Sequence, residues 1–174
     1  MVTILWYTGN TALERAIKAF TRSTYTHCAI YVDGVLYEAL GNGVNRRTGD
    51  AARNRALGAV AYVTVNVDHT LQKRGVLVTS DYAEMVNFLE TETRDAYSVT
   101  QLITDGIAIL TGHRWIIAAN GCWTCSGLVA AALTAARVPI QPDKGWDDPA
   151  TFSPADLAAV LHPTTASVPA GALS

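Results

Sequence analysis

The chain has 174 residues, of which 49% are hydrophobic and 16% are charged. This length and apolar content predict one domain with a substantial core rather than two domains. Its 13 Lys and Arg residues against 15 Asp and Glu residues leave a formal net charge of −2, which argues against nucleic acid or an anionic membrane as a partner.

The N-terminus is expected to form a strand followed by a helix. Residues 1–8 lack the basic region of a secretion signal, and Thr11 with Glu14 has the spacing of a helix capping box. The most apolar runs further along the chain are residues 103–110, 115–119 and 128–136. Each run is shorter than the ~18 residues that a membrane-spanning helix needs, so we expect neither a signal peptide nor a transmembrane segment.

Residues 27–40 have the pattern of a β-hairpin. Two runs of β-forming residues flank Asp33 and Gly34, a dipeptide typical of a tight turn. With these two residues as the turn, His27 and Glu38 lie on neighbouring antiparallel strands. Because side chains alternate between the faces of a strand, the two become diagonal neighbours on one face.

A polar segment and then a segment of alternating apolar and polar residues follow the hairpin. Residues 45–55 contain four arginines and are expected to form a solvated loop or a short helix. Residues 61–67 alternate as a strand does. Helices are expected from Asp81, within residues 97–110, from Cys125 with Thr124 as its cap, and from Pro154 with Ser153 as its cap. We expect the domain to span residues 1–163 and residues 164–174 to form a loose tail.

The three cysteines are Cys28, Cys122 and Cys125. They cannot all pair within one chain, and two of them lie in a single Cys-Trp-Thr-Cys run rather than being spread as in a disulfide framework. This distribution predicts a reducing compartment in which at least one thiol is free for chemistry.

Cys125 stands at the expected start of a helix, where the helix dipole and free amide groups favour the thiolate. A nearby histidine would lower the pKa of the thiol further, and His27 with Glu38 has the chemistry of a base and its orienting residue. Spacing alone does not bring residue 125 to residue 27. An inert buried cysteine, a redox pair with Cys122, and a zinc site that includes Cys28 therefore stay open at this point.

Three short motifs occur in order along the chain. They are Thr-His-Cys-Ala-Ile-Tyr at 26–31, Tyr-Glu-Ala at 37–39 and Cys-Ser-Gly-Leu-Val at 125–129. In this order they resemble the circularly permuted NlpC-type branch of papain-like cysteine hydrolases, with its YiiX-like and lecithin retinol acyltransferase-like members. Two positions depart from the pattern of that family, because Gly127 replaces a common glutamate and Cys28 replaces a small aliphatic residue.

The resemblance implies an α+β, papain-like fold in which an antiparallel sheet packs against helices and the nucleophile begins a buried helix. It implies Cys125 as the nucleophile, His27 as the general base and Glu38 as the residue that orients the imidazole. It also implies a reaction that uses no metal and no other cofactor.

The activity implied by the resemblance is cleavage of an amide bond through an acyl-enzyme. Peptidoglycan stem peptides are the leading substrate class, for an endopeptidase or amidase of bacterial or phage origin in the cytoplasm or associated with a phage. The partner would be a peptide-like or acyl substrate such as a peptidoglycan fragment. A lipid acyl hydrolase or acyltransferase, and a non-catalytic binding or virion-structural module, are the alternatives.

Aromatic and basic residues supply the candidates for substrate contact. Trp6, Tyr97 and Trp123 are candidates to line a cleft, although aromatic residues near a core are structural by default. Arg46 and Arg47 are candidates to receive an acidic peptide or a phosphate head group, and a solvated loop is the simpler interpretation of the same residues.

Overall fold

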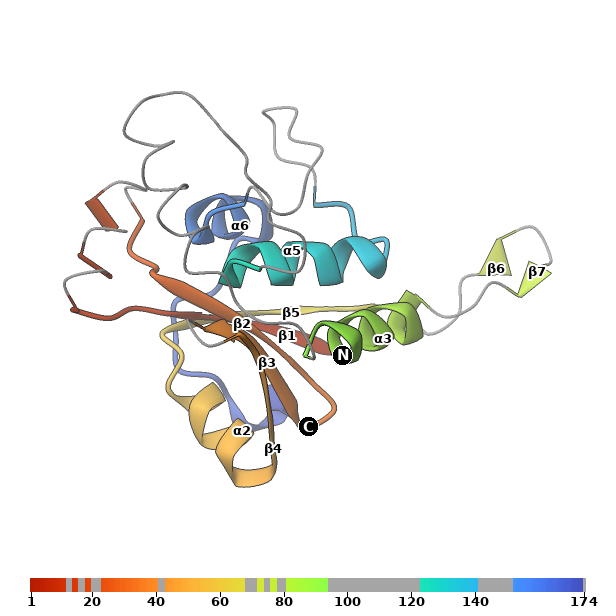
Figure 1. Ribbon diagram of the computed structural model, residues 1–174, viewed down its shortest axis with the longest axis horizontal. Coiled ribbons are helices and arrows are strands. Elements are labelled where there is room, and N and C mark those ends of the chain that lie inside the picture. The colour runs from red at the N-terminus through yellow and green to blue at the C-terminus, as the bar shows by residue number, and fades with distance from the viewer. Residues whose placement is uncertain are drawn as a thin grey trace.

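The described part of the chain contains a five-stranded antiparallel sheet with helices on both faces and a separate two-stranded ribbon (Figure 1). The computed structural model describes residues 1–11, 14–15, 18–19, 23–40, 43–67, 72–73, 76–77, 81–93, 123–140 and 152–173. Together the sheet and helices confirm the expected α+β class.

The strands of the sheet follow the order β4-β3-β2-β1-β5, and each neighbouring pair is antiparallel. Their bounds are β1 (Val2–Tyr7), β2 (His27–Val32), β3 (Val35–Leu40), β4 (Gly43–Thr48) and β5 (Ala61–Val65). A separate two-stranded ribbon consists of β6 (Gln72–Lys73) and β7 (Val76–Leu77).

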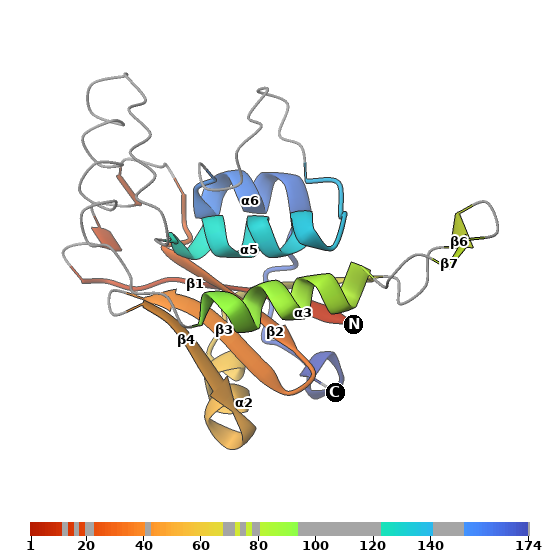
Figure 2. The same cartoon turned by 45° about the vertical axis from the view of Figure 1, so that its right-hand side comes forward.

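The helices divide between the two faces of the sheet (Figures 1 and 2). Their bounds are α2 (Gly49–Leu57), α3 (Asp81–Glu92), α5 (Cys125–Ala135), α6 (Pro154–Leu161) and the 3-10 helix η2 (Ala170–Leu173). Helices α3, α5 and α6 contribute to the core on one face, whereas α2 and η2 pack against the other. No helix in the described ranges is both long and apolar enough to cross a membrane.

The hairpin between β2 and β3 has the predicted turn. Asp33 and Gly34 have φ angles of 48° and 76°, the pair of positive values that a type I′ turn requires. The ladder runs in the predicted register from Val32 opposite Val35 to Ile30 opposite Tyr37, where it ends. The first residues of β2 therefore lie beyond the ladder with β3, although they still pair with β1.

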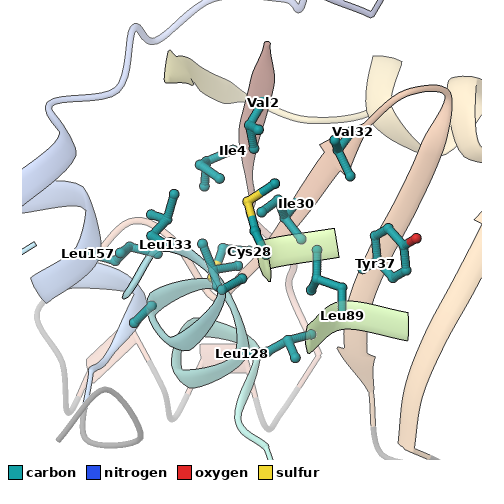
Figure 3. Packing of buried hydrophobic residues seen from close by; sticks show 14 of the residues in the cluster. Val2, Ile4, Cys28, Ile30, Val32, Tyr37, Leu89, Leu128, Leu133 and Leu157 are labelled. Carbon is teal, nitrogen blue, oxygen red and sulfur yellow. The ribbon is translucent and has the colours of Figure 1, made fainter. Parts of the chain in front are cut away.

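Alternation along β2 separates two clusters of buried residues. Cys28 and Ile30 belong to the cluster that includes Leu128 and Leu133 of α5 (Figure 3). Ala29 belongs with residues of α2 to the cluster on the opposite face. Strand β2 is therefore covered on both faces. Helix α5, which carries Cys125, lies on one face, and α2 lies on the other.

Side-chain caps set the starts of two helices as predicted. Thr124 Oγ1 accepts a hydrogen bond from the Gly127 amide at 3.0 Å, which places Cys125 at the first position of α5. Ser153 and Asp156 form a capping box at the start of α6, with Pro154 as its first residue. At the N-terminus, Thr11 and Glu14 make the reciprocal contacts of the expected capping box.

Two segments differ from their expected structure. Residues 45–48, the first part of the segment expected to be a loop or short helix, belong to β4, because their backbone completes the edge of the sheet beside β3, whereas the expected short helix is present as α2 from Gly49. The tail expected to be loose packs on the sheet: Thr164 pairs with Tyr62, and the Thr3 hydroxyl donates to the Ala172 carbonyl at 2.7 Å. The helix expected within residues 97–110 lies outside the described residues.

Candidate active site

Cys125, His27 and Glu38 come from three elements that meet at one end of the sheet. Cys125 is the first residue of α5, His27 is the first residue of β2, and Glu38 lies in β3. Helix α5 packs against both strands. The fold thus brings together the three residues that the sequence singled out, although Cys125 is far from the other two along the chain.

His27 and Glu38 are joined by a hydrogen bond. Nε2 of His27 lies 3.0 Å from Oε2 of Glu38, and the Glu38 side chain has 0% exposure. Since Nε2 faces the carboxylate, Nδ1 is the ring nitrogen left for the thiol of Cys125. This is the arrangement by which a carboxylate selects the tautomer and orientation of a catalytic imidazole.

Two arginines share the same carboxylate. Arg47 Nε donates to Oε1 of Glu38 at 2.9 Å, and Arg55 donates to Oε2 through Nε and Nη2 at 3.2 and 3.1 Å. Burial opposes ionisation of Glu38, but the hydrogen bonds from His27, Arg47 and Arg55 outweigh burial and lower its pKa from 4.5 to about 2. Glu38 is therefore a carboxylate near neutral pH.

The thiol and the imidazole favour the charged form of each other. Burial lowers the pKa of His27, but the Cys125 thiolate and hydrogen bonds with Cys125 and Glu38 outweigh burial and raise it from 6.5 to about 9. A hydrogen bond from the Cys28 side chain, followed by the charge of His27, holds the pKa of Cys125 well below its ordinary range despite burial. Cys125 and His27 thus form a thiolate and imidazolium pair.

Cys28 is a second thiol at the site, and its side chain is fully buried. Burial, together with its contact with Cys125, raises the pKa of Cys28 well above the ordinary range. Cys28 therefore stays protonated and donates to the neighbouring thiolate. A cysteine at position 28, where an aliphatic residue would only pack, thus places a hydrogen-bond donor beside Cys125.

The start of α5 leaves amide donors beside the thiol. The first turn of a helix has backbone N–H groups without partners inside the helix. Thr124 takes the amide of Gly127, and the described residues contain no partner for the amides of Cys125 and Ser126. These two donors have the position and chemistry of an oxyanion hole.

Tyr7 is a site residue that sequence reasoning did not single out, and Arg55 was considered there only as one of the four arginines of residues 45–55. The guanidinium of Arg55 lies 4.0 Å from the centre of the Tyr7 ring, and the Tyr7 hydroxyl donates to the Arg55 carbonyl at 3.1 Å. The Tyr7 ring lies 5.6 Å from the His27 ring. The arginine-rich composition of residues 45–55 signalled charge there, but no local pattern indicated which arginine turns toward Glu38.

The aromatic substrate candidates have different surroundings. Trp6 has 0% exposure and donates its indole N–H to the Pro154 carbonyl at 3.3 Å, so it packs inside the core. Trp123 is partly buried, directly precedes the cap of α5, and contacts Phe88 edge to face. Tyr97 lies outside the described residues.

The basic candidates separate because neighbouring residues of β4 point to opposite faces of the sheet. Arg46 pairs with Glu90 of α3 at 2.8 Å, whereas Arg47 pairs with Glu38. Cys122 lies outside the described residues. Within the described part of the chain, no three His, Cys, Asp or Glu side chains are grouped so that they could hold a metal ion.

Neither a family model nor a curated protein matches the chain. The chemistry of the site therefore rests on the geometry described above and on the motif resemblance.

Proposed function

We propose that the chain is a cysteine hydrolase with Cys125 as nucleophile, His27 as general acid and base, and Glu38 as the residue that orients His27. The observation that carries this proposal is the contact of His27 with both Glu38 and Cys125. A histidine of this kind, between a buried carboxylate and a thiol at a helix start, is the arrangement of an activated nucleophile. The papain-like and circularly permuted topology belongs to the same proposal.

The acylation step begins with the thiolate already formed. Cys125 Sγ attacks the carbonyl carbon of an amide, and the amides of Cys125 and Ser126 stabilise the resulting oxyanion. The His27 imidazolium transfers its proton to the amide nitrogen as the C–N bond breaks. The products are a free amine and a thioester on Cys125.

Water completes the cycle. Neutral His27 removes a proton from a water molecule, whose oxygen attacks the thioester carbonyl. The C–S bond breaks, a carboxylic acid leaves, and the pair of thiolate and imidazolium is restored. Glu38 stays ionised throughout because its charge is held by three hydrogen-bonding partners.

Peptidoglycan stem peptides are the substrate class that we propose for this site. The support is the resemblance of the three motifs to NlpC-type hydrolases, and the near-neutral charge of the chain suits a substrate that is not a polyanion. An apolar acyl chain is the rival substrate, and the test below includes it.

Mass spectrometry of the intact protein tests the reaction and the substrate together. The protein is incubated separately with pooled muropeptides and with short-chain lipid esters, and adducts are mapped to individual cysteines. We expect an acyl adduct on Cys125 and released products with muropeptides, and neither with Cys125→Ala. Turnover by a folded Cys125→Ala variant would refute the proposal, and an adduct formed with lipid esters alone would replace the substrate class.

A further inference from the structure

The carboxylate of Glu38 receives more support than a surface ion pair would supply. One oxygen accepts from Arg47, and the other accepts from Arg55 and contacts His27, all within 3.2 Å. A buried carboxylate is costly unless it is paired and hydrogen-bonded. The two guanidinium groups keep Glu38 paired even at the stage of the reaction in which His27 is neutral.

Tyr7 holds Arg55 in place through two contacts. The Arg55 guanidinium lies over the ring of Tyr7, and the Tyr7 hydroxyl donates to the backbone carbonyl of Arg55. The same ring lies beside the imidazole of His27. One aromatic side chain therefore contacts both the base and the arginine that binds its orienting carboxylate.

We propose that Arg47 and Arg55 are positioning residues, which hold the ionised carboxylate of Glu38 so that it orients His27 toward Cys125. This inference rests on the proposed cysteine hydrolase and gives β4 and α2 a role in it. The arginines act through Glu38, because that carboxylate is the site group with which both of them are paired. Their remaining guanidinium surface is partly exposed and stays in water.

The pH dependence of Cys125 alkylation by iodoacetamide tests this role without any substrate. In the Arg47→Gln, Arg55→Gln double variant, burial of Glu38 is no longer compensated by two charged donors, so Glu38 takes up a proton at higher pH. We expect the ratio of the alkylation rate at about pH 5 to the rate at about pH 8 to be about tenfold lower in the double variant than in the wild type. Arg53→Gln, an exposed position on the same helix, is the matched control and should retain the wild-type ratio.

The same double substitution made in a Glu38→Gln protein separates a positioning role from general stabilisation. If the arginines act through Glu38, the double substitution should not change the pH profile further once Glu38→Gln is present, because the group that titrates is gone. An arginine effect of equal size in both backgrounds would overturn the proposal. So would a wild-type pH profile in the folded double variant.

Arg55→Lys provides the measurement if the double variant does not fold. Lysine keeps the charge but loses the planar fork that contacts Oε2 through two nitrogens. We expect a smaller shift of the profile in the same direction, and an unchanged profile would count against the proposal. An ordinary, slow thiol at Cys125 in the wild-type protein would instead refute the proposed hydrolase, so the two failures are distinguishable.

Discussion

Nε2 of His27 lies 3.0 Å from Oε2 of Glu38, a carboxylate with no exposed surface. The contact joins the start of β2 to β3 beyond the end of their ladder. Because Glu38 accepts from Nε2, the imidazole presents Nδ1 toward the start of α5. The hairpin thus supplies both the proposed base and the carboxylate that orients it, and α5 supplies the thiol.

The thiolate should be evident in the pH dependence of alkylation. An ordinary thiol with a pKa of about 8.5 is almost wholly protonated at about pH 6. Because the pKa of Cys125 is held well below its ordinary range, we expect iodoacetamide to modify it rapidly at that pH. Peptide mass spectrometry would give the rate for each cysteine. Cys28 serves as the internal control, since its buried thiol should stay unmodified in the folded protein.

The upper pH limit of turnover should follow His27. The pKa of this imidazole is raised to about 9, so its proton is available to the leaving group below that pH and is lost above it. We expect turnover to decline through about pH 9 while alkylation of the thiolate continues. A rate profile that falls instead near pH 6.5 would indicate a histidine without a thiolate partner.

Cys28 should contribute to the reactivity of Cys125 through its hydrogen bond. Cys28→Ala removes the donor and raises the pKa of Cys125, so we expect alkylation at about pH 6 to slow about tenfold, with little change at about pH 9. Cys28→Ser retains a donor of similar size and should behave more like the wild type. Identical profiles for the alanine variant and the wild type would show that the thiol of Cys28 only packs.

Glu38→Gln should reduce both turnover and stability. We expect turnover to fall less than in Cys125→Ala or His27→Ala, because Glu38 orients the base without touching the substrate. Loss of the charged acceptor should lower the free energy of unfolding by about 1–3 kcal/mol at neutral pH.

The stability difference between wild type and Glu38→Gln should depend on pH in a defined direction. The pKa of Glu38 falls from 4.5 to about 2 on folding, so its stabilising effect is fully present above pH 4.5 and is lost as the pH falls toward 2. Urea unfolding of both proteins across this range measures the difference. A gap that stays constant down to pH 2 would contradict the assigned role of the buried carboxylate.

The cap of α5 should matter for reactivity as well as stability. Thr124→Ala removes the acceptor of the Gly127 amide and should cost about 1 kcal/mol. Ser153→Ala removes the corresponding cap of α6 and should cost a similar amount. We expect Thr124→Ala also to slow alkylation of Cys125 at about pH 6, because it loosens the turn that carries the thiol. Equal alkylation rates in the two folded variants would argue against this link.

Local patterns in the sequence predicted the elements that carry the site. The turn at Asp33 and Gly34 fixed the hairpin register, because a two-residue type I′ turn needs two successive residues with positive φ, and few dipeptides allow this. Thr124 placed Cys125 at a helix start, because the capping hydrogen bond spans three residues. The hydrogen bond of His27 to Glu38 followed from the alternation of side chains along paired strands.

The arrangement between distant segments depended on the tertiary structure. Packing of α5 on the sheet brings Cys125 to His27, and the register between β3 and β4 places Arg47 diagonally opposite Glu38 on the same face of the sheet. Neither contact has a local sequence signal, because each depends on how separate elements pair or pack against one another. By itself the sequence determined which residues could form a nucleophile, a base and an orienting group. The tertiary structure decided that they meet and that two arginines hold the carboxylate.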